Sequence, residues 1–271
     1  MRIDISGLVF EYPSGPRALD GVDLVLEGTD PVAIVGQNGA GKTTLVKHLN
    51  GILRPTAGSV SVDGVDIEDR TTAQWSAYVG YVFQNPDNQL FLESVRSEFE
   101  FGPKQLGVPD DEIQRRLEWV AELTGMSDKL DRHPADLSPT EKKFCAMGTV
   151  IMMDPDVVIF DEPTCGQDLK GVARLARVID ELRRLGKLCI TISHDTKFVT
   201  RYFPRTVVMC QGKVLTQGST QEVFERVDLL RQSFVIPPPV ARVAREAGIE
   251  RAVFDVDALI EAVIQEKGKG N

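Results

Sequence analysis

The stretch Gly36-Gln37-Asn38-Gly39-Ala40-Gly41-Lys42-Thr43 matches the phosphate-binding pattern G-x-x-x-x-G-K-[ST] at every fixed position. A short β-branched run, Val32 to Val35, precedes it, and a helix is predicted from Thr43 to Asn50. A strand, a glycine-rich loop and a helix in this order turn backbone N–H groups and the helix N-terminus toward phosphate oxygens. The sequence therefore predicts a nucleotide phosphate site, rather than a glycine turn that only caps a helix.

The sequence of this loop predicts that it binds both a nucleotide and a metal ion. Lys42 is expected to reach the β and γ phosphates, and the hydroxyl of Thr43 to bind Mg²⁺. ATP and Mg²⁺ are therefore the predicted cofactors. The other residues that we expect to contact ATP are Asn38, Gly39, Ala40, Gly41 and Thr44.

Two adjacent carboxylates follow the apolar strand predicted from Val157 to Phe160. After such a strand, Asp161-Glu162 would usually be a solvated turn. In a chain that also has a phosphate loop, we expect Asp161 to hold the metal, partly through water, and Glu162 to orient the attacking water. The pair predicts hydrolysis of the bound nucleotide.

The remaining pattern predicts an α/β protein. Strands at Val157 to Phe160 and Leu188 to Ile192 flank a helix predicted from Val172 to Leu185, which implies parallel strands. Short strands within the first 35 residues, and another from Gly58 to Ile67 with a turn at Asp63-Gly64, predict a mixed β layer.

We expect an ATPase domain at residues 1–218, with an N-terminal antiparallel β subdomain and a helical subdomain near 86–150. A small helical extension is predicted at 219–271, where Pro237-Pro238-Pro239 separates a short helix from two later helical pieces. Apolar residues from Val256 to Ile264 form one stripe on the last helix. The stripe is expected to pack on its own domain or on a second subunit.

Composition limits the class of partner. The chain has 31 Lys and Arg against 40 Asp and Glu, a formal net charge of −9, which argues against direct binding to nucleic acid. No run approaches the ~18 apolar residues that cross a bilayer, and the start of the chain predicts no secretory signal. The four cysteines form no C-x-x-C pair and predict reduced thiols.

Beyond these motifs, the chain resembles the ABC ATPases from Met1 to about Glu225. The resemblance implies that Tyr12 stacks on adenine and that Gln84 senses Mg²⁺ and the transport subunit. It implies that His194 contacts the γ-phosphate as a catalytic residue beside Glu162. Asp161, Glu162 and Asp168 match the Walker B aspartate, the catalytic glutamate and the D-loop aspartate.

Within that family the sequence most resembles the ATPase subunits of energy-coupling factor importers and of related cobalt or nickel importers. The similarity lies in Tyr81 to Phe91, Phe101-Gly102-Pro103 and Pro237 to Arg242. It implies a dimer with a second ABC ATPase subunit, identical or different. It also implies a transmembrane partner that holds the chain at the cytoplasmic face of the cell membrane, and coupling of hydrolysis to import.

The family signature Leu-Ser-Gly-Gly-Gln is replaced here by Leu137-Ser138-Pro139-Thr140-Glu141. The resemblance implies that Ser138, Pro139, Thr140 and Asp168 face the nucleotide of the partner subunit. Ser138 and Glu141 form a capping-box pattern, so we expect a helix to begin here. Pro139 lacks a donor and Glu141 adds negative charge, which predicts weaker phosphate binding.

Two alternatives to a transport ATPase stay open on sequence. One is an ABC ATPase that works without a transporter. The other is a nucleotide-binding regulatory subunit with low turnover, which the altered signature leaves open. Neighbouring genes for a multi-helix membrane subunit and a second ATPase would favour the importer.

Overall fold

The computed structural model describes residues 1–13 and 15–269, the last four of these by their backbone alone. Its first layer is an antiparallel sheet with strand order β2-β1-β4-β5. Apolar residues alternate along β1 and β2, so one face of each strand is buried. The strands are β1 (Arg2–Glu11), β2 (Arg17–Glu27), β4 (Ala57–Val62) and β5 (Val65–Asp66).

The second layer is a six-stranded sheet in the order β10-β9-β3-β8-β7-β6. All its neighbouring strands are parallel except β9 and β10. The central strands are buried on both faces, which explains why they are continuous apolar runs. The strands are β3 (Val32–Val35), β6 (Val79–Val82), β7 (Val157–Asp161), β8 (Leu188–Ile192), β9 (Arg205–Cys210) and β10 (Lys213–Ser219).

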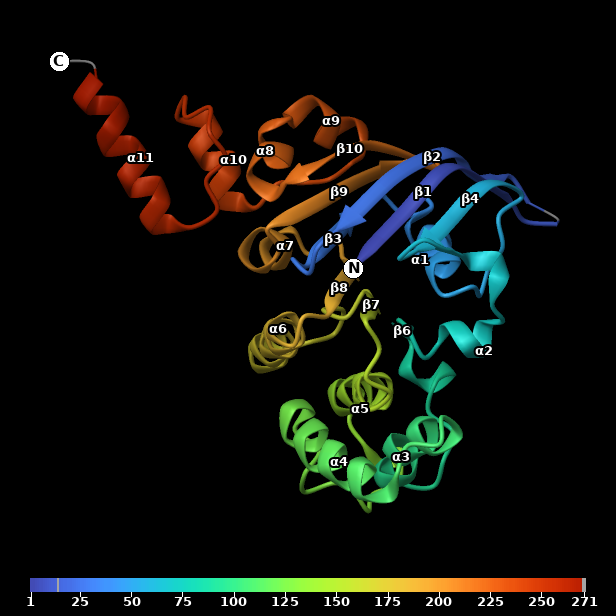
Figure 1. Cartoon of the computed structure of the whole chain (residues 1–271). Helices are drawn as coiled ribbons and strands as arrows, with labels where there is room; N and C mark the ends of the chain where they lie inside the picture. Colours follow the sequence, from blue (N-terminus) through green and yellow to red (C-terminus); the bar gives the residue numbers. More distant parts are fainter. Residues whose placement is uncertain (14, 270–271) are drawn as a thin grey trace.

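Two apolar cores lie on opposite faces of β3. Val32 and Ile34 pack with the antiparallel sheet and with α1, whereas Ala33 and Val35 pack with the helices of the other face. Figure 1 shows those helices, α3 to α7, along the lower and left part of the molecule. The first seven α-helices of the described chain are α1 (Lys42–Leu49), α2 (Thr72–Trp75), α3 (Val95–Gln105), α4 (Asp110–Thr124), α5 (Pro139–Ile151), α6 (Leu169–Arg184) and α7 (Thr196–Tyr202).

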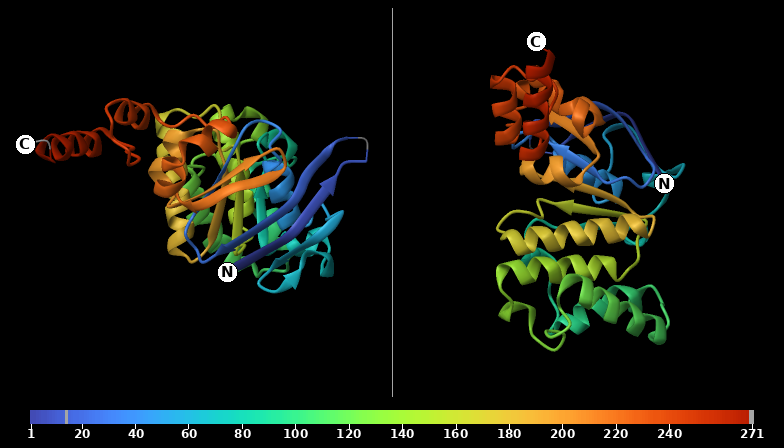
Figure 2. Two further views of the ribbon diagram at one scale, coloured as in Figure 1. Left: turned by 90° about the horizontal axis from the view of Figure 1, so that it is seen from above. Right: turned by 90° about the vertical axis from the view of Figure 1, so that its left-hand side faces the viewer.

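Three 3₁₀ turns and a C-terminal set of helices complete the described chain. In both views of Figure 2, α10 and α11 lie beyond the sheets, at the edge of the molecule. The turns are η1 (Ile67–Asp69), η2 (Pro86–Asn88) and η3 (Pro134–Asp136), and the helices are α8 (Thr220–Glu225), α9 (Val227–Gln232), α10 (Pro239–Glu246) and α11 (Val256–Lys269).

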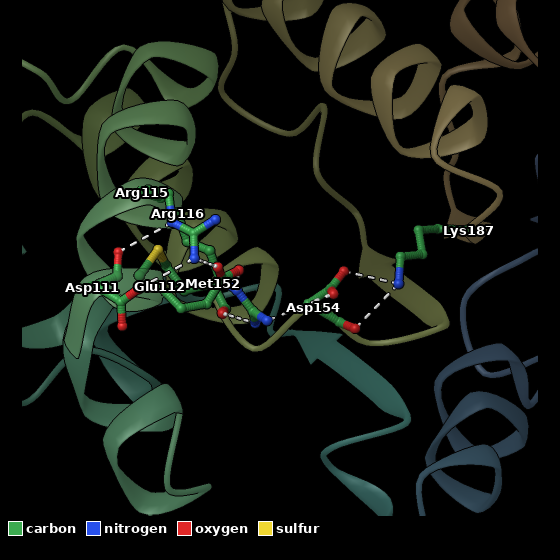
Figure 3. Close-up of polar contacts among 7 residues, drawn as sticks. All are labelled: Asp111, Glu112, Arg115, Arg116, Met152, Asp154 and Lys187. Carbon is green, nitrogen blue, oxygen red and sulfur yellow. Dashed lines mark hydrogen bonds and ion pairs between the residues drawn. The ribbon is translucent and has the colours of Figure 1, made fainter. Parts of the chain in front are cut away.

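Polar contacts fasten α4 to the core (Figure 3). Arg116 of α4 contacts Asp154, in the loop before β7, at 3.9 Å, and donates to the Met152 carbonyl at 3.3 Å. Asp154 in turn pairs with Lys187 at the start of β8 at 2.8 Å. Asp154 has φ 55°, a left-handed conformation that is uncommon outside glycine but that Asp adopts more often than most residues. These contacts therefore join α4 to the loop before β7 and that loop to the residue preceding β8.

The predicted fold class is confirmed, with two local differences. β1 and β2 have 10 and 11 residues, so the prediction of short strands here was wrong. Irregular register between Ile5 and Leu8 lets β1 continue past Gly7. Helix α9 was not predicted because it has only six residues, too few for apolar residues to recur at helical spacing. Residues 270–271 of the predicted extension lie outside the described residues.

Among the helices that the structure describes, none combines the length and the apolar character needed to cross a bilayer.

Candidate nucleotide site

A pocket of about 830 Å³ lies where the carboxyl ends of the parallel strands meet. The loops after β3, β6, β7 and β8 all contribute to it. The structure brings together every residue that the sequence assigned to this chain's own site: Tyr12, Asn38, Gly39, Ala40, Gly41, Lys42, Thr43, Thr44, Gln84, Asp161, Glu162 and His194.

Two glycines of the phosphate loop are required by close packing. A Cβ on Gly36 would lie 2.1 Å from the backbone oxygen of Met209 in β9. A Cβ on Gly41 would lie 2.7 Å from the backbone oxygen of Ala18, and Gly41 has φ 98°. The loop is therefore pressed against both sheets, and residues 38–43 of it line the pocket.

Lys42 and Thr43 lie at the start of α1, as the motif predicts. The Lys42 ammonium donates to the carbonyls of Gly36 and Gln37 at 2.8 and 2.9 Å. Burial lowers the pKa of Lys42, while the nearby Glu162 and Asp161 carboxylates act in the opposite direction. The Thr43 hydroxyl donates to Asp161 Oδ2 at 3.1 Å. Oxygen ligands of this kind suit Mg²⁺.

Asp161 is held from a second side by a residue that sequence reasoning did not assign to the site. The hydroxyl of Tyr81, in β6, donates to Asp161 Oδ2 at 2.6 Å. Burial and the adjacent carboxylate raise the pKa of Tyr81, so its proton stays in this hydrogen bond. A tyrosine in a buried apolar strand needs a partner for its hydroxyl, and this signal could have identified it.

Glu162 and His194 contact each other in the pocket. The backbone N–H of His194 donates to Glu162 Oε2 at 3.2 Å, and His194 Nε2 lies 3.0 Å from Glu162 Oε1. Burial raises the pKa of Glu162, although the hydrogen bond from His194 and the charge of Lys42 act against this. Burial and Lys42 lower the pKa of His194. A carboxylate with raised basicity beside a neutral imidazole can take a proton from water.

Tyr12 and Gln84 both line the pocket. The Tyr12 hydroxyl is 3.2 Å from Thr44 Oγ1, and its ring packs edge-on against Phe10. Gln84 is exposed and follows β6, so its amide is free to turn toward a bound metal or a neighbouring subunit.

The altered signature forms the helix cap that the sequence predicts. Ser138 Oγ accepts from the Glu141 N–H at 3.3 Å, and the Glu141 carboxylate accepts from the Ser138 N–H at 2.8 Å. These hydrogen bonds lower the pKa of Glu141, so the carboxylate stays charged. Asp168 caps α6 through Gly171 at 2.7 Å. Ser138, Pro139, Thr140 and Asp168 do not line this chain's pocket. Their role toward a second nucleotide stays a prediction.

The ABC transporter family matches residues 19–165, more than half of the chain. The chain belongs to this family. The match covers the phosphate loop, the strand that ends in Asp161 and the altered signature. The chain is therefore a nucleotide-binding ATPase of this family.

Similar proteins carry related names. The energy-coupling factor transporter ATP-binding protein EcfA of Methanothermobacter thermautotrophicus is 38% identical over 257 residues, which is 94% of this chain and 82% of that protein. EcfA of Methanocaldococcus jannaschii is 36% identical over 241 residues, 88% of this chain and 86% of that protein. The resemblance to energy-coupling factor ATPases is thus confirmed.

Solved structures agree on the fold. CbiO1 from Clostridium perfringens, part of the ABC transporter complex cbiONQ, has a TM-score of 0.75 at 34% identity, over 84% of this chain and 92% of CbiO1. A dimeric ATP-binding cassette bound to ADP and Pi, MJ0796, has a TM-score of 0.73 at 21% identity, over 80% of this chain and 98% of that cassette. The second likeness concerns the fold alone.

Proposed function

We propose that this chain is the ATPase subunit of a membrane importer of the energy-coupling factor kind, and that it hydrolyses MgATP between two ATPase subunits. The convergence of Lys42, Asp161, Glu162 and His194 on one pocket is the observation that carries the proposal. Relatives named as energy-coupling factor ATP-binding proteins support the transporter context.

The residues of the pocket have separable tasks in this proposal. Lys42 neutralises phosphate charge, and the Tyr12 ring stacks on adenine. Thr43, Asp161 and Gln84 would hold Mg²⁺, partly through water, and their oxygens are the donors it prefers. When bound, the metal neutralises charge on the transferred phosphoryl group. Glu162 orients the attacking water and accepts its proton, and His194 contacts the γ-phosphate.

An apolar groove near Gln84 is the proposed docking site for a transmembrane subunit. It has a volume of about 240 Å³ and runs between β6 and α3. The rings of Phe91 and Phe101 lie 5.3 Å apart on its rim, and 67% and 43% of these residues is exposed. Buried Glu98 accepts from the N–H groups of Phe91 and Leu92, which fixes the rim. Exposed aromatic pairs of this kind are typical of protein interfaces.

Gln89 connects this groove to the signature helix. Its amide accepts from the Phe83 N–H at 3.1 Å and donates to the Ala146 carbonyl in α5 at 2.7 Å. A subunit in the groove would therefore push on α5, whose N-terminus faces the second nucleotide in the proposed dimer. Through that subunit the chain would lie at the cytoplasmic face of the membrane.

We further propose that the second ATPase subunit differs from this one and has a glycine-rich signature. Such a signature would complete the site on this chain's phosphate loop. The opposite site would be closed by Ser138, Pro139 and Thr140, where Pro139 offers no N–H and Glu141 adds a negative charge near the phosphates. The two ATP sites would then be unequal.

The test compares variants of the full chain in its complex with the transport subunits. Lys42→Ala should weaken ATP binding about 100-fold, the loss of one strong charged contact of ~3 kcal/mol. Glu162→Gln should bind ATP but hydrolyse it about 100-fold or more slowly. Lys47→Ala, a lysine on the same helix outside the pocket, is the control. Unchanged turnover in Glu162→Gln would remove this residue from the mechanism.

A second test separates the transporter from its alternatives. Phe91→Ala with Phe101→Ala should abolish co-purification with the membrane subunit and leave ATP binding intact. Replacing Pro139, Thr140 and Glu141 by Gly, Gly and Gln should raise hydrolysis by the isolated chain. Brisk hydrolysis by the unmodified chain alone, with no gain on replacement, would refute unequal sites. Retained co-purification would favour an ATPase that docks elsewhere or works without a transporter.

A further inference from the structure

Lys143 connects the signature helix to the loop that follows β7. It lies in the second turn of α5, and its side chain leaves the helix toward Glu162 and Cys165. Its ammonium donates to the carbonyl of Cys165 at 2.6 Å and to the carbonyl of Glu162 at 3.4 Å. The neighbouring Lys142 points elsewhere and pairs with Asp87 at 2.9 Å.

The two carbonyls belong to one tight turn. The Cys165 N–H donates to the Glu162 carbonyl at 3.3 Å, and the Glu162 N–H donates to Ile192 in β8 at 3.0 Å. Glu162 has φ 49°, in the left-handed region that a residue with a side chain adopts only when it is held there. Lys143 binds both ends of this turn, so it opposes relaxation of the backbone that carries the Glu162 carboxylate.

Lys143 is placed for carbonyl oxygens rather than for a carboxylate. Within the described part of the chain it forms no ion pair, whereas Lys142, Lys129 and Lys187 all do. Burial lowers the pKa of Lys143, and the nearby Glu162 and Cys165 act against this. Hydrogen bonds from a charged donor to two backbone oxygens offset the cost of half-burying this cation and fix the two carbonyls relative to α5.

We propose that Lys143 is a positioning residue for hydrolysis: its ammonium fixes the turn 162–165 and so aims the Glu162 carboxylate at the attacking water. The inference rests on the proposed function, in which Glu162 orients that water. It adds a direct connection from α5 to the catalytic carboxylate. Because α5 begins at the altered signature, movement of that helix changes the aim of Glu162 in the same subunit.

The experiment measures MgATP hydrolysis and equilibrium ATP binding for the full chain in its complex with the transport subunits. Lys143→Met should lower kcat about tenfold, the effect of one charge-assisted hydrogen bond, and change ATP affinity less than about twofold. Lys143→Arg keeps a donor and should recover most of kcat. Lys142→Met, the adjacent lysine on the same helix, should hydrolyse ATP at the rate of the unmodified complex.

A double variant tests whether Lys143 acts through Glu162. In single-turnover reactions, adding Lys143→Met to Glu162→Gln should slow hydrolysis no further, since the carboxylate to be aimed is gone. An unchanged kcat in Lys143→Met, an additive loss in the double variant, or an equal loss in Lys142→Met would each overturn the inference. If Lys143→Met does not fold, as judged by its thermal midpoint, Lys143→Gln and Lys143→Arg carry the same comparison.

The outcomes also separate this inference from the proposed function. Full turnover in Glu162→Gln would refute the role of Glu162 and with it both proposals. An inactive Glu162→Gln together with an unaffected Lys143→Met would refute the positioning role alone.

Discussion

Tyr81→Phe removes a single oxygen from a buried contact and should destabilise the protein measurably. Tyr81 is 7% exposed and Asp161 is 5% exposed, and their 2.6 Å hydrogen bond involves a carboxylate. Hydrogen bonds to charged groups contribute about 1.5–3 kcal/mol. Thr43 still donates to Asp161, so the carboxylate keeps one contact. We therefore expect a loss of about 1.5–2 kcal/mol.

The assay is urea unfolding of the full chain, with the thermal midpoint as a second readout. For a chain of this size, the loss corresponds to a fall in Tm of roughly 3–8 °C. Tyr78→Phe is the matched control, because Tyr78 is 42% exposed and its hydroxyl makes no hydrogen bond in the described structure. It should change stability by less than about 0.5 kcal/mol. Equal stability of Tyr81→Phe and the unmodified chain would refute the reasoning, as would equal losses in both variants.

Three further predictions concern the loop, the carboxylate and the helix attachment. Gly36→Ala should abolish ATP binding and lower Tm, because its Cβ would lie 2.1 Å from the backbone oxygen of Met209. Gly28→Ala is the control: it is also at positive φ but in open space, so it should lower Tm only slightly, and an ATP titration distinguishes the two variants. Burial raises the pKa of Glu162 above its usual 4.5, so its charge destabilises the fold above that folded-state pKa. Glu162→Gln should therefore be more stable than the unmodified chain at pH 7 and should lose that gain as the pH falls toward 4.5. Urea unfolding midpoints at both pH values check this, and a gain independent of pH would contradict it. Arg116→Met should lower the free energy of unfolding in urea by about 1 kcal/mol, since Arg116 is half-buried between Glu112, Met152 and Asp154. Arg115→Met, at an exposed position on the same helix, should lower it by less.

The sequence predicts most of the pocket because its residues lie in motifs whose spacing is set by phosphate geometry. Gly36 to Thr43, and Asp161-Glu162 after an apolar strand, carry their chemistry in the local pattern. The structure adds Tyr81, whose contact depends on which strands are neighbours, and Lys143, whose contacts depend on how α5 packs beside the loop after β7. Tyr81 is beside β7 only because β6 pairs with it, and no local pattern encodes that pairing.

Backbone details escaped prediction for the same reason. Asp154 and Glu162 adopt left-handed conformations, which are uncommon for residues other than glycine and rarer for Glu than for Asp. Lys187, just before β8, pairs with Asp154, and Ile192 at the end of β8 accepts from Glu162; both partners lie more than 25 positions later in the chain. The capping box at Ser138 was predictable because all its atoms lie within one helical turn.

The strand order of the large sheet also bears on how the chain folds as it is synthesised. β3, which leads into the phosphate loop, pairs with β8 and β9, so its neighbours end at Ile192 and Cys210. From Val35 to Cys210 is 210 − 35 = 175 residues. At ~5–20 residues per second, a ribosome needs roughly 9–35 seconds to make them. Until that interval ends, β3 lacks at least one of its two hydrogen-bonding neighbours, and the first antiparallel sheet, which packs against Val32 and Ile34, is the earlier-made element that can cover it.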